Sequence, residues 1–95
     1  ISLTYTMPAC PSPGGLTVIP TPNSANISWV GTTTPPADGY QYGITDSDTP
    51  PTVYETTNGT TGTVGQLISS NQYYAWVRSA CGNNTYSSWI KRAIP

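Results

Sequence analysis

Short runs of alternating apolar and polar residues, separated by proline- and glycine-rich stretches, recur along the chain. In the clearest of them, Ala25, Ile27 and Trp29 alternate with polar residues. A period of two places one set of side chains on each face of a β-strand, and no segment shows the longer period of an amphipathic helix. The chain is therefore predicted to be all-β.

Seven such runs follow one another at a spacing of about 8–12 residues. They cover residues 16–19, 25–30, 39–45, 52–57, 61–67, 72–81 and 86–94. Strands this short and this regularly spaced predict a seven-stranded antiparallel Greek-key β-sandwich. The apolar faces of the strands predict its core: Leu16, Val18, Ile27, Trp29, Tyr40, Tyr42, Ile44, Val64, Leu67, Tyr73, Ala75 and Val77. In the last run Lys91 and Arg92 are adjacent, so one of them faces inward unless a bulge re-aims it.

The low charge of the chain excludes some classes of partner. Charged residues make up 7% of the sequence and the net charge is −1. Three scattered cations do not form the basic field that binding to nucleic acid requires. No apolar run is long enough to cross a membrane, so membrane insertion is not expected.

The residue types needed for catalysis are also scarce. The chain has no histidine, the usual general base and the commonest metal ligand. Its four acids lie on three different segments, whereas glycoside hydrolysis needs two carboxylates flanking a cleft. Asp46 and Asp48 supply few of the six to eight oxygens that calcium takes, so residues 46–48 are interpreted as a polar turn. We expect no enzyme activity, no metal and no cofactor.

Two cysteines, Cys10 and Cys81, bear on the cellular compartment. An even count in a small, lightly charged domain favours a disulfide and an oxidising environment, and the alternative is two buried thiols in a cytosolic protein. Residues 1–9 contain Pro8 near their end and are predicted to be a linker or the tail of a preceding module. The remaining residues, 10–95, are predicted to form one domain.

The motifs from Cys10 to the end resemble a fibronectin type III domain. A tryptophan on the second strand and a cysteine before the first strand exclude the antibody pattern. Leu67, followed six residues later by Tyr73, resembles the tyrosine corner, in which the Tyr hydroxyl bonds back to the backbone, although Ser69 stands where the family often has proline. The other matching positions are Pro13 and Leu16, Ile27-Ser28-Trp29, and Gly39-Tyr40 with Tyr42.

The positions of the cysteines extend this resemblance to a particular class of proteins. A Cys before the first strand and the Arg78-x-x-Cys81-Gly82 motif are similar to modules of secreted bacterial multidomain proteins, often polysaccharide-degrading enzymes or adhesins. In this topology the first strand starts where the sixth ends, so the resemblance implies a Cys10–Cys81 disulfide. It also implies a secreted or cell-surface, monomeric, non-catalytic accessory or spacer module whose partners are neighbouring domains of its own chain.

Two alternative functions rest on particular residues. Tyr74 and Trp76 on the outer face of the sixth strand, with Trp89 on the last, could stack on sugar rings and make a carbohydrate-binding module for a polysaccharide. The structural interpretation of the same residues is a tryptophan–arginine ladder, in which Arg78 stacks on Trp89. The other alternative is a protein-docking or adhesion domain that uses the loops at residues 31–38 and 82–86.

Overall fold

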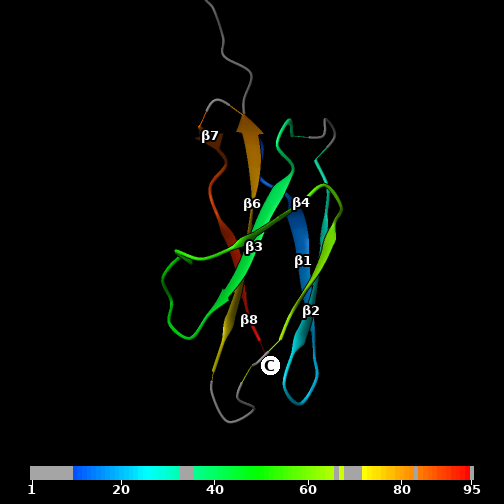
Figure 1. Ribbon diagram of the computed structural model, residues 1–95, viewed down its shortest axis with the longest axis vertical. Coiled ribbons are helices and arrows are strands. Elements are labelled where there is room, and N and C mark those ends of the chain that lie inside the picture. Colours follow the sequence, from blue (N-terminus) through cyan, green and yellow to red (C-terminus); the bar gives the residue numbers. More distant parts are fainter. Residues whose placement is uncertain (1–9, 33–35, 66, 68–71, 83, 95) are drawn as a thin grey trace, which may run out of the picture.

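The structure is a computed structural model that describes residues 10–32, 36–65, 67, 72–82 and 84–94. Within these residues the chain forms eight β-strands and no helix (Figure 1). The strands are β1 (Gly14–Pro20), β2 (Ala25–Val30), β3 (Tyr40–Thr45), β4 (Glu55–Thr57), β5 (Thr61–Val64), β6 (Tyr74–Gly82), β7 (Thr85–Tyr86) and β8 (Ile90–Ala93). In the part of the chain described, no helix could cross a membrane.

The strands form two antiparallel sheets. One has the order β1-β2-β5, and the other has the order β4-β3-β6-β7, with β8 also paired to β6. The chain changes sheet after β2, after β4 and after β5. The predicted all-β antiparallel sandwich is confirmed.

The strand count differs from the prediction because the last strand is in two pieces. β7 pairs with the end of β6, and β8 pairs with its start. Between them, the Ser87 hydroxyl accepts a hydrogen bond from the Ser79 backbone N–H at 2.8 Å. The Ser87 backbone N–H donates to the Ser79 carbonyl at 3.0 Å. A side chain thus replaces a backbone acceptor here, and the regular ladder is interrupted.

The fourth strand is shorter than predicted because residues 51–53 lie across β3 instead of beside it. A Cβ atom built on Gly43 would lie 3.1 Å from the Val53 carbonyl oxygen and 3.2 Å from the ring of Pro51. Gly43 therefore allows this segment to pass close over the outer face of the sheet, where a larger side chain would block it.

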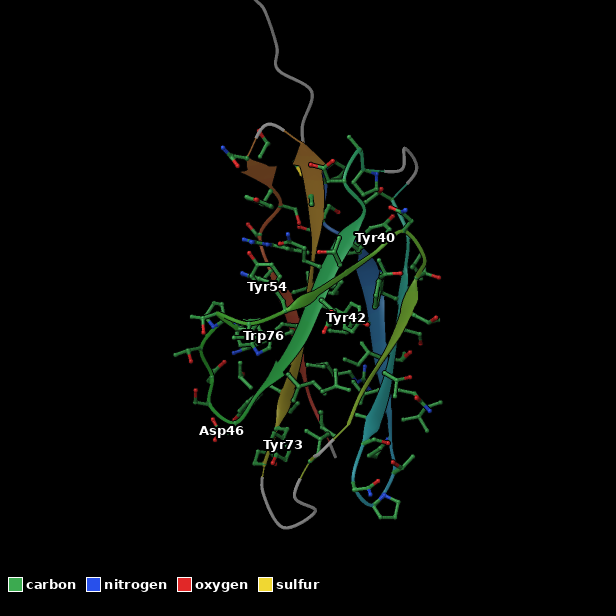
Figure 2. All side chains as sticks on the ribbon, viewed as in Figure 1. Tyr40, Tyr42, Asp46, Tyr54, Tyr73 and Trp76 are labelled. Atoms are coloured by element: carbon green, nitrogen blue, oxygen red, sulfur yellow. A yellow bond between two sulfur atoms is a disulfide. The ribbon has the colours of Figure 1, made fainter. Side chains whose placement is uncertain are left out.

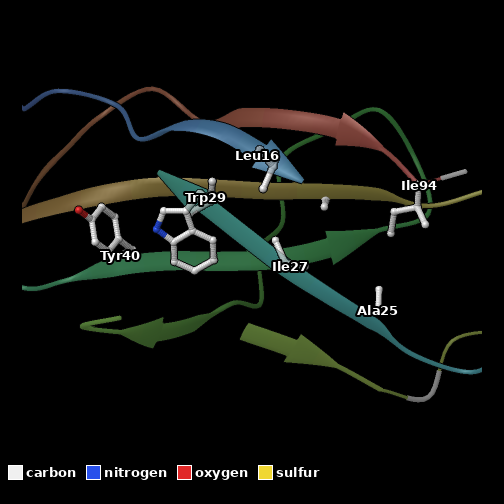
Figure 3. Packing of buried hydrophobic residues seen from close by; sticks show 8 residues of the cluster. Leu16, Ala25, Ile27, Trp29, Tyr40 and Ile94 are labelled. Atoms are coloured by element: carbon white, nitrogen blue, oxygen red, sulfur yellow. The ribbon is translucent and has the colours of Figure 1, made fainter. Parts of the chain in front are cut away.

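The core lies between the sheets (Figure 3). The structure places every residue of the predicted core in the buried cluster or packed against it, and adds Ala25, Ile90 and Ile94. At its centre, the Trp29 ring meets Tyr40 edge-on and Tyr42 at a tilt, each with ring centroids 5.7 Å apart. Residues 68–71 lie outside the described residues, so the hydrogen bond expected at the tyrosine corner stays a prediction.

Arg92 shows how an edge strand accommodates a charge that points toward the core. It pairs with buried Ala75 in the register of β8 and β6. Because β8 lies at the sheet edge, the guanidinium reaches out to the Leu16 carbonyl on β1, with Nη1 donating at 3.3 Å. The side chain remains exposed and links the two sheets without a bulge in β8.

A disulfide between Cys10 and Cys81 closes one end of the sandwich, which we call the cysteine pole. Their Cα atoms are 5.8 Å apart and 71 positions apart in the sequence. Beside it, the buried Ser79 hydroxyl donates to the Pro11 carbonyl at 2.7 Å. The disulfide and this hydrogen bond attach the segment before β1 to β6.

Replacing Gly62 by alanine is expected to lower the free energy of unfolding by about 1–3 kcal/mol. The Tyr42 ring lies directly on Gly62, and an added Cβ would sit 2.5 Å from its Cε2 atom. Gly65 is the matched control, because a Cβ there meets nothing within 4 Å. Urea unfolding of both variants is the measurement, and equal losses would contradict this role of Gly62.

Candidate functional site

The outer face of the five-stranded sheet gathers cations and aromatic rings. Strand β6 alternates, so that Ala75, Val77 and Ser79 are buried between the sheets. Tyr74, Trp76 and Arg78 therefore point to the opposite face. Residues from β7, β8 and the segment before β4 contact them. Figure 2 labels Tyr54 and Trp76 among the side chains of this region.

Arg78 lies among three rings, and together these four residues form what we call the stacked cluster: Tyr54, Arg78, Tyr86 and Trp89. The guanidinium carbon is 4.0 Å from the ring centroid of Tyr86, 4.4 Å from that of Trp89 and 5.3 Å from that of Tyr54. Tyr54 and Trp89 also meet edge-on, with centroids 5.8 Å apart. The contact between Arg78 and Trp89 matches the predicted tryptophan–arginine ladder.

A buried amide fixes the orientation of the guanidinium. Nε of Arg78 donates to Oε1 of Gln41 at 2.8 Å, and Gln41 is itself buried on β3. Cation–π contacts at exposed sites contribute about 0.5–1 kcal/mol each. The ring stacking and the hydrogen bond together hold Arg78 in one position.

Lys91 forms a second, smaller arrangement on the same face. Its ammonium lies 5.7 Å from the ring centroid of Trp76 and 5.9 Å from that of Tyr74. It also forms an ion pair with Asp48. The interpretation of residues 46–48 as a polar turn agrees with hydrogen bonds there, such as that from the Thr45 hydroxyl to the Ser47 carbonyl at 2.7 Å.

Trp76 does not form the exposed platform that the sequence suggested. It points outward, but only 5% of its surface is exposed. Its Nε1 donates to the Thr45 hydroxyl at 2.8 Å, and residues 51–53 lie across its register partner Gly43. Of the three aromatic residues predicted as ligand contacts, Tyr74 and Trp76 lie under Lys91, and Trp89 belongs to the stacked cluster.

Two members of the stacked cluster were not predicted. Tyr54 is 37% exposed and Tyr86 is 41% exposed. Tyr54 lies just before β4, next to Val53, and because both residues are apolar the alternation does not show which of them points inward. Tyr86 stands at a loop boundary, and no local pattern relates it to Arg78.

The loops proposed for protein docking are only partly described, because residues 33–35 and 83 lie outside the described residues. The remainder is tied to the sheet, since the Asp38 backbone N–H donates to the Ala80 carbonyl at 2.9 Å. No group of three or more acidic, histidine or cysteine side chains that could hold a metal occurs in the part described. The docking function of these loops stays a prediction.

No family model and no curated protein matches the sequence. Among solved structures, the chain is similar to a computationally redesigned β-sandwich protein, with 20% identity over 90% of this chain and 89% of that one and a TM-score of 0.73. A two-domain fibronectin type III segment of chicken tenascin has 24% identity over 86% of this chain and 47% of that one, with a TM-score of 0.72. An Fn3-like protein from Clostridium thermocellum has 22% identity over 90% and 92%, with a TM-score of 0.68. With the two-sheet topology, these similarities show that the chain has the fold of fibronectin type III domains.

Proposed function

We propose that this domain is a non-catalytic accessory module that acts as an in-line spacer in a secreted multidomain protein. The observation that carries the proposal is that residues 10 and 94 lie at opposite ends of β6. Cys10 is bonded to Cys81 at the end of β6, and the Ile94 backbone N–H donates to the Tyr73 carbonyl, just before its start, at 2.8 Å. Nine residues of strand span about 30 Å.

Two further features support this proposal. The disulfide suits an oxidising compartment outside the cytosol. On the outer face, Arg78 stacks on rings of the same chain and Lys91 pairs with Asp48. The resemblance to modules of secreted bacterial proteins makes a polysaccharide-active or adhesive parent our specific proposal.

The test places the full chain between a donor and an acceptor fluorescent protein. Single-molecule energy transfer is expected to give one narrow distribution of distances, because the folded domain fixes the separation of its two ends. A Gly/Ser linker of equal length is the control and gives a broad distribution. A broad distribution for the domain would contradict the spacer proposal.

A second candidate function is carbohydrate binding through the outer face. It is favoured by the exposure of Tyr54 and Tyr86 beside Trp89, because sugars commonly stack on accessible aromatic rings. The test is a glycan array with the wild-type chain and with Tyr86→Ala. Loss of binding in a folded variant supports this function. The control is Val53→Ala, at an apolar residue 84% exposed on the same segment as Tyr54.

A further inference from the structure

Arg78 holds hydrogen-bond donors that no described residue uses. A guanidinium carries five N–H donors. In the described part of the chain, the hydrogen bond of Arg78 runs from Nε to Gln41, which leaves the four N–H groups of Nη1 and Nη2. The one ion pair among the described residues is that of Lys91 with Asp48, so Arg78 has no carboxylate partner there.

Lys91, the other cation on this face, differs from Arg78 in having a carboxylate partner among the described residues. Both cations lie over aromatic rings on the same face of the same sheet. Lys91 has the carboxylate of Asp48 to neutralise it, and Arg78 has only neutral neighbours in its cluster. A carboxylate at Arg78 would complete the arrangement that Lys91 already has.

The shape of the guanidinium determines the direction from which a carboxylate can bind both terminal nitrogens. The N–H bonds of a guanidinium lie in its own plane, so a carboxylate that binds Nη1 and Nη2 together meets the guanidinium at its edge and not over a face. Rings and Gln41 already fix Arg78, so little entropy is lost when it binds a carboxylate through two parallel hydrogen bonds. Tyr54 and Tyr86, whose ring centroids lie 5.3 and 4.0 Å from the guanidinium carbon, are partly exposed and offer apolar ring surface near it.

We propose that the stacked cluster binds a uronic acid residue of an acidic polysaccharide. The carboxylate would accept hydrogen bonds from Nη1 and Nη2 of Arg78, and the apolar C–H face of the sugar would lie on Tyr54 or Tyr86. A uronic acid carries both groups that the site can bind, a carboxylate for Arg78 and an apolar C–H face for the tyrosine rings. The inference rests on the carbohydrate-binding function proposed above and adds its substrate class.

The experiment compares polygalacturonate with its methyl-esterified form, in isothermal titration of the full chain. Esterification keeps the sugar ring and removes the negative charge, so we expect binding to polygalacturonate and at least about tenfold weaker binding to the ester. Arg78→Lys keeps the charge but loses the planar pair of donors, and a similar loss is expected. Lys91→Met is the matched control, expected to change the affinity by less than about threefold.

The possible failures can be told apart. Equal binding to both polymers would overturn the role of the carboxylate and leave carbohydrate binding standing. Equal binding to polyglutamate, with the same dependence on Arg78, would make the ligand an acidic peptide and overturn the proposal. If the chain binds neither acidic nor neutral glycans, both the proposal and the carbohydrate-binding function are overturned. If Arg78→Lys does not fold, the comparison of the two polymers on the wild-type chain still decides whether the carboxylate is recognised.

Discussion

Replacing Cys10 and Cys81 together by serine is expected to lower the free energy of unfolding by about 4 kcal/mol. The disulfide joins residues 71 positions apart. Closing a loop of that length removes chain entropy from the unfolded state equivalent to about 4.4 kcal/mol, and removing native disulfides from small secreted domains costs about 2–5 kcal/mol. Domains of this kind are stable by only about 5–15 kcal/mol, so the variant is expected to be marginal.

Urea unfolding followed by tryptophan fluorescence measures this effect. The wild-type chain with a reductant is the parallel sample, expected to lose the same stability because it loses the same covalent link. Ser12→Ala is the control for changes near the cysteine pole, since Ser12 is exposed and its hydroxyl makes a hydrogen bond to the Ser88 carbonyl. A loss below about 1 kcal/mol in the double variant would show that the pole is held mainly by other contacts.

Replacing Trp29 by alanine is expected to cost about 3–5 kcal/mol of stability. Only 4% of its surface is exposed, and its ring contacts Tyr40 and Tyr42, which lie on the facing sheet. Removing the indole leaves a cavity between the sheets and ends both aromatic contacts. Thermal and urea unfolding of Trp29→Ala measure the loss.

Trp29→Phe provides the informative comparison. The indole Nε1 is buried and has no hydrogen-bond partner among the described residues. An unsatisfied buried donor costs about 1–3 kcal/mol, so removing it offsets part of the packing that phenylalanine loses. We expect Trp29→Phe to be clearly more stable than Trp29→Ala. Both variants remove the indole N–H, so equal losses would show that the phenyl ring recovers none of the packing that the indole provides.

The sequence predicted the core well, because alternation is a local property. Ile27 and Trp29 follow a strict period of two on β2, and so do Ala75 and Val77 on β6. The cysteine pairing required the topology, since only the fold shows that the chain before β1 meets the end of β6.

The environment of Trp76 could not be predicted from local pattern. Alternation gives its direction correctly, but its burial depends on a distant segment that crosses Gly43. Gly62 shows a similar limit. A glycine in a strand usually weakens it, yet here the absence of a side chain at Gly62 leaves room for the Tyr42 ring from the opposite sheet. Both features depend on contacts between segments that no pattern within one strand records.

The position of the disulfide also determines how the domain responds to a pulling force. Tension entering at residue 10 passes through the disulfide to residue 81, so the strands between them carry none of it. Only residues 82–94 can then be drawn out, which adds at most about 45 Å of extended chain. With the disulfide reduced, residues 10–94 could extend to about 290 Å. In its oxidised form the domain can therefore release several-fold less chain under tension than in its reduced form.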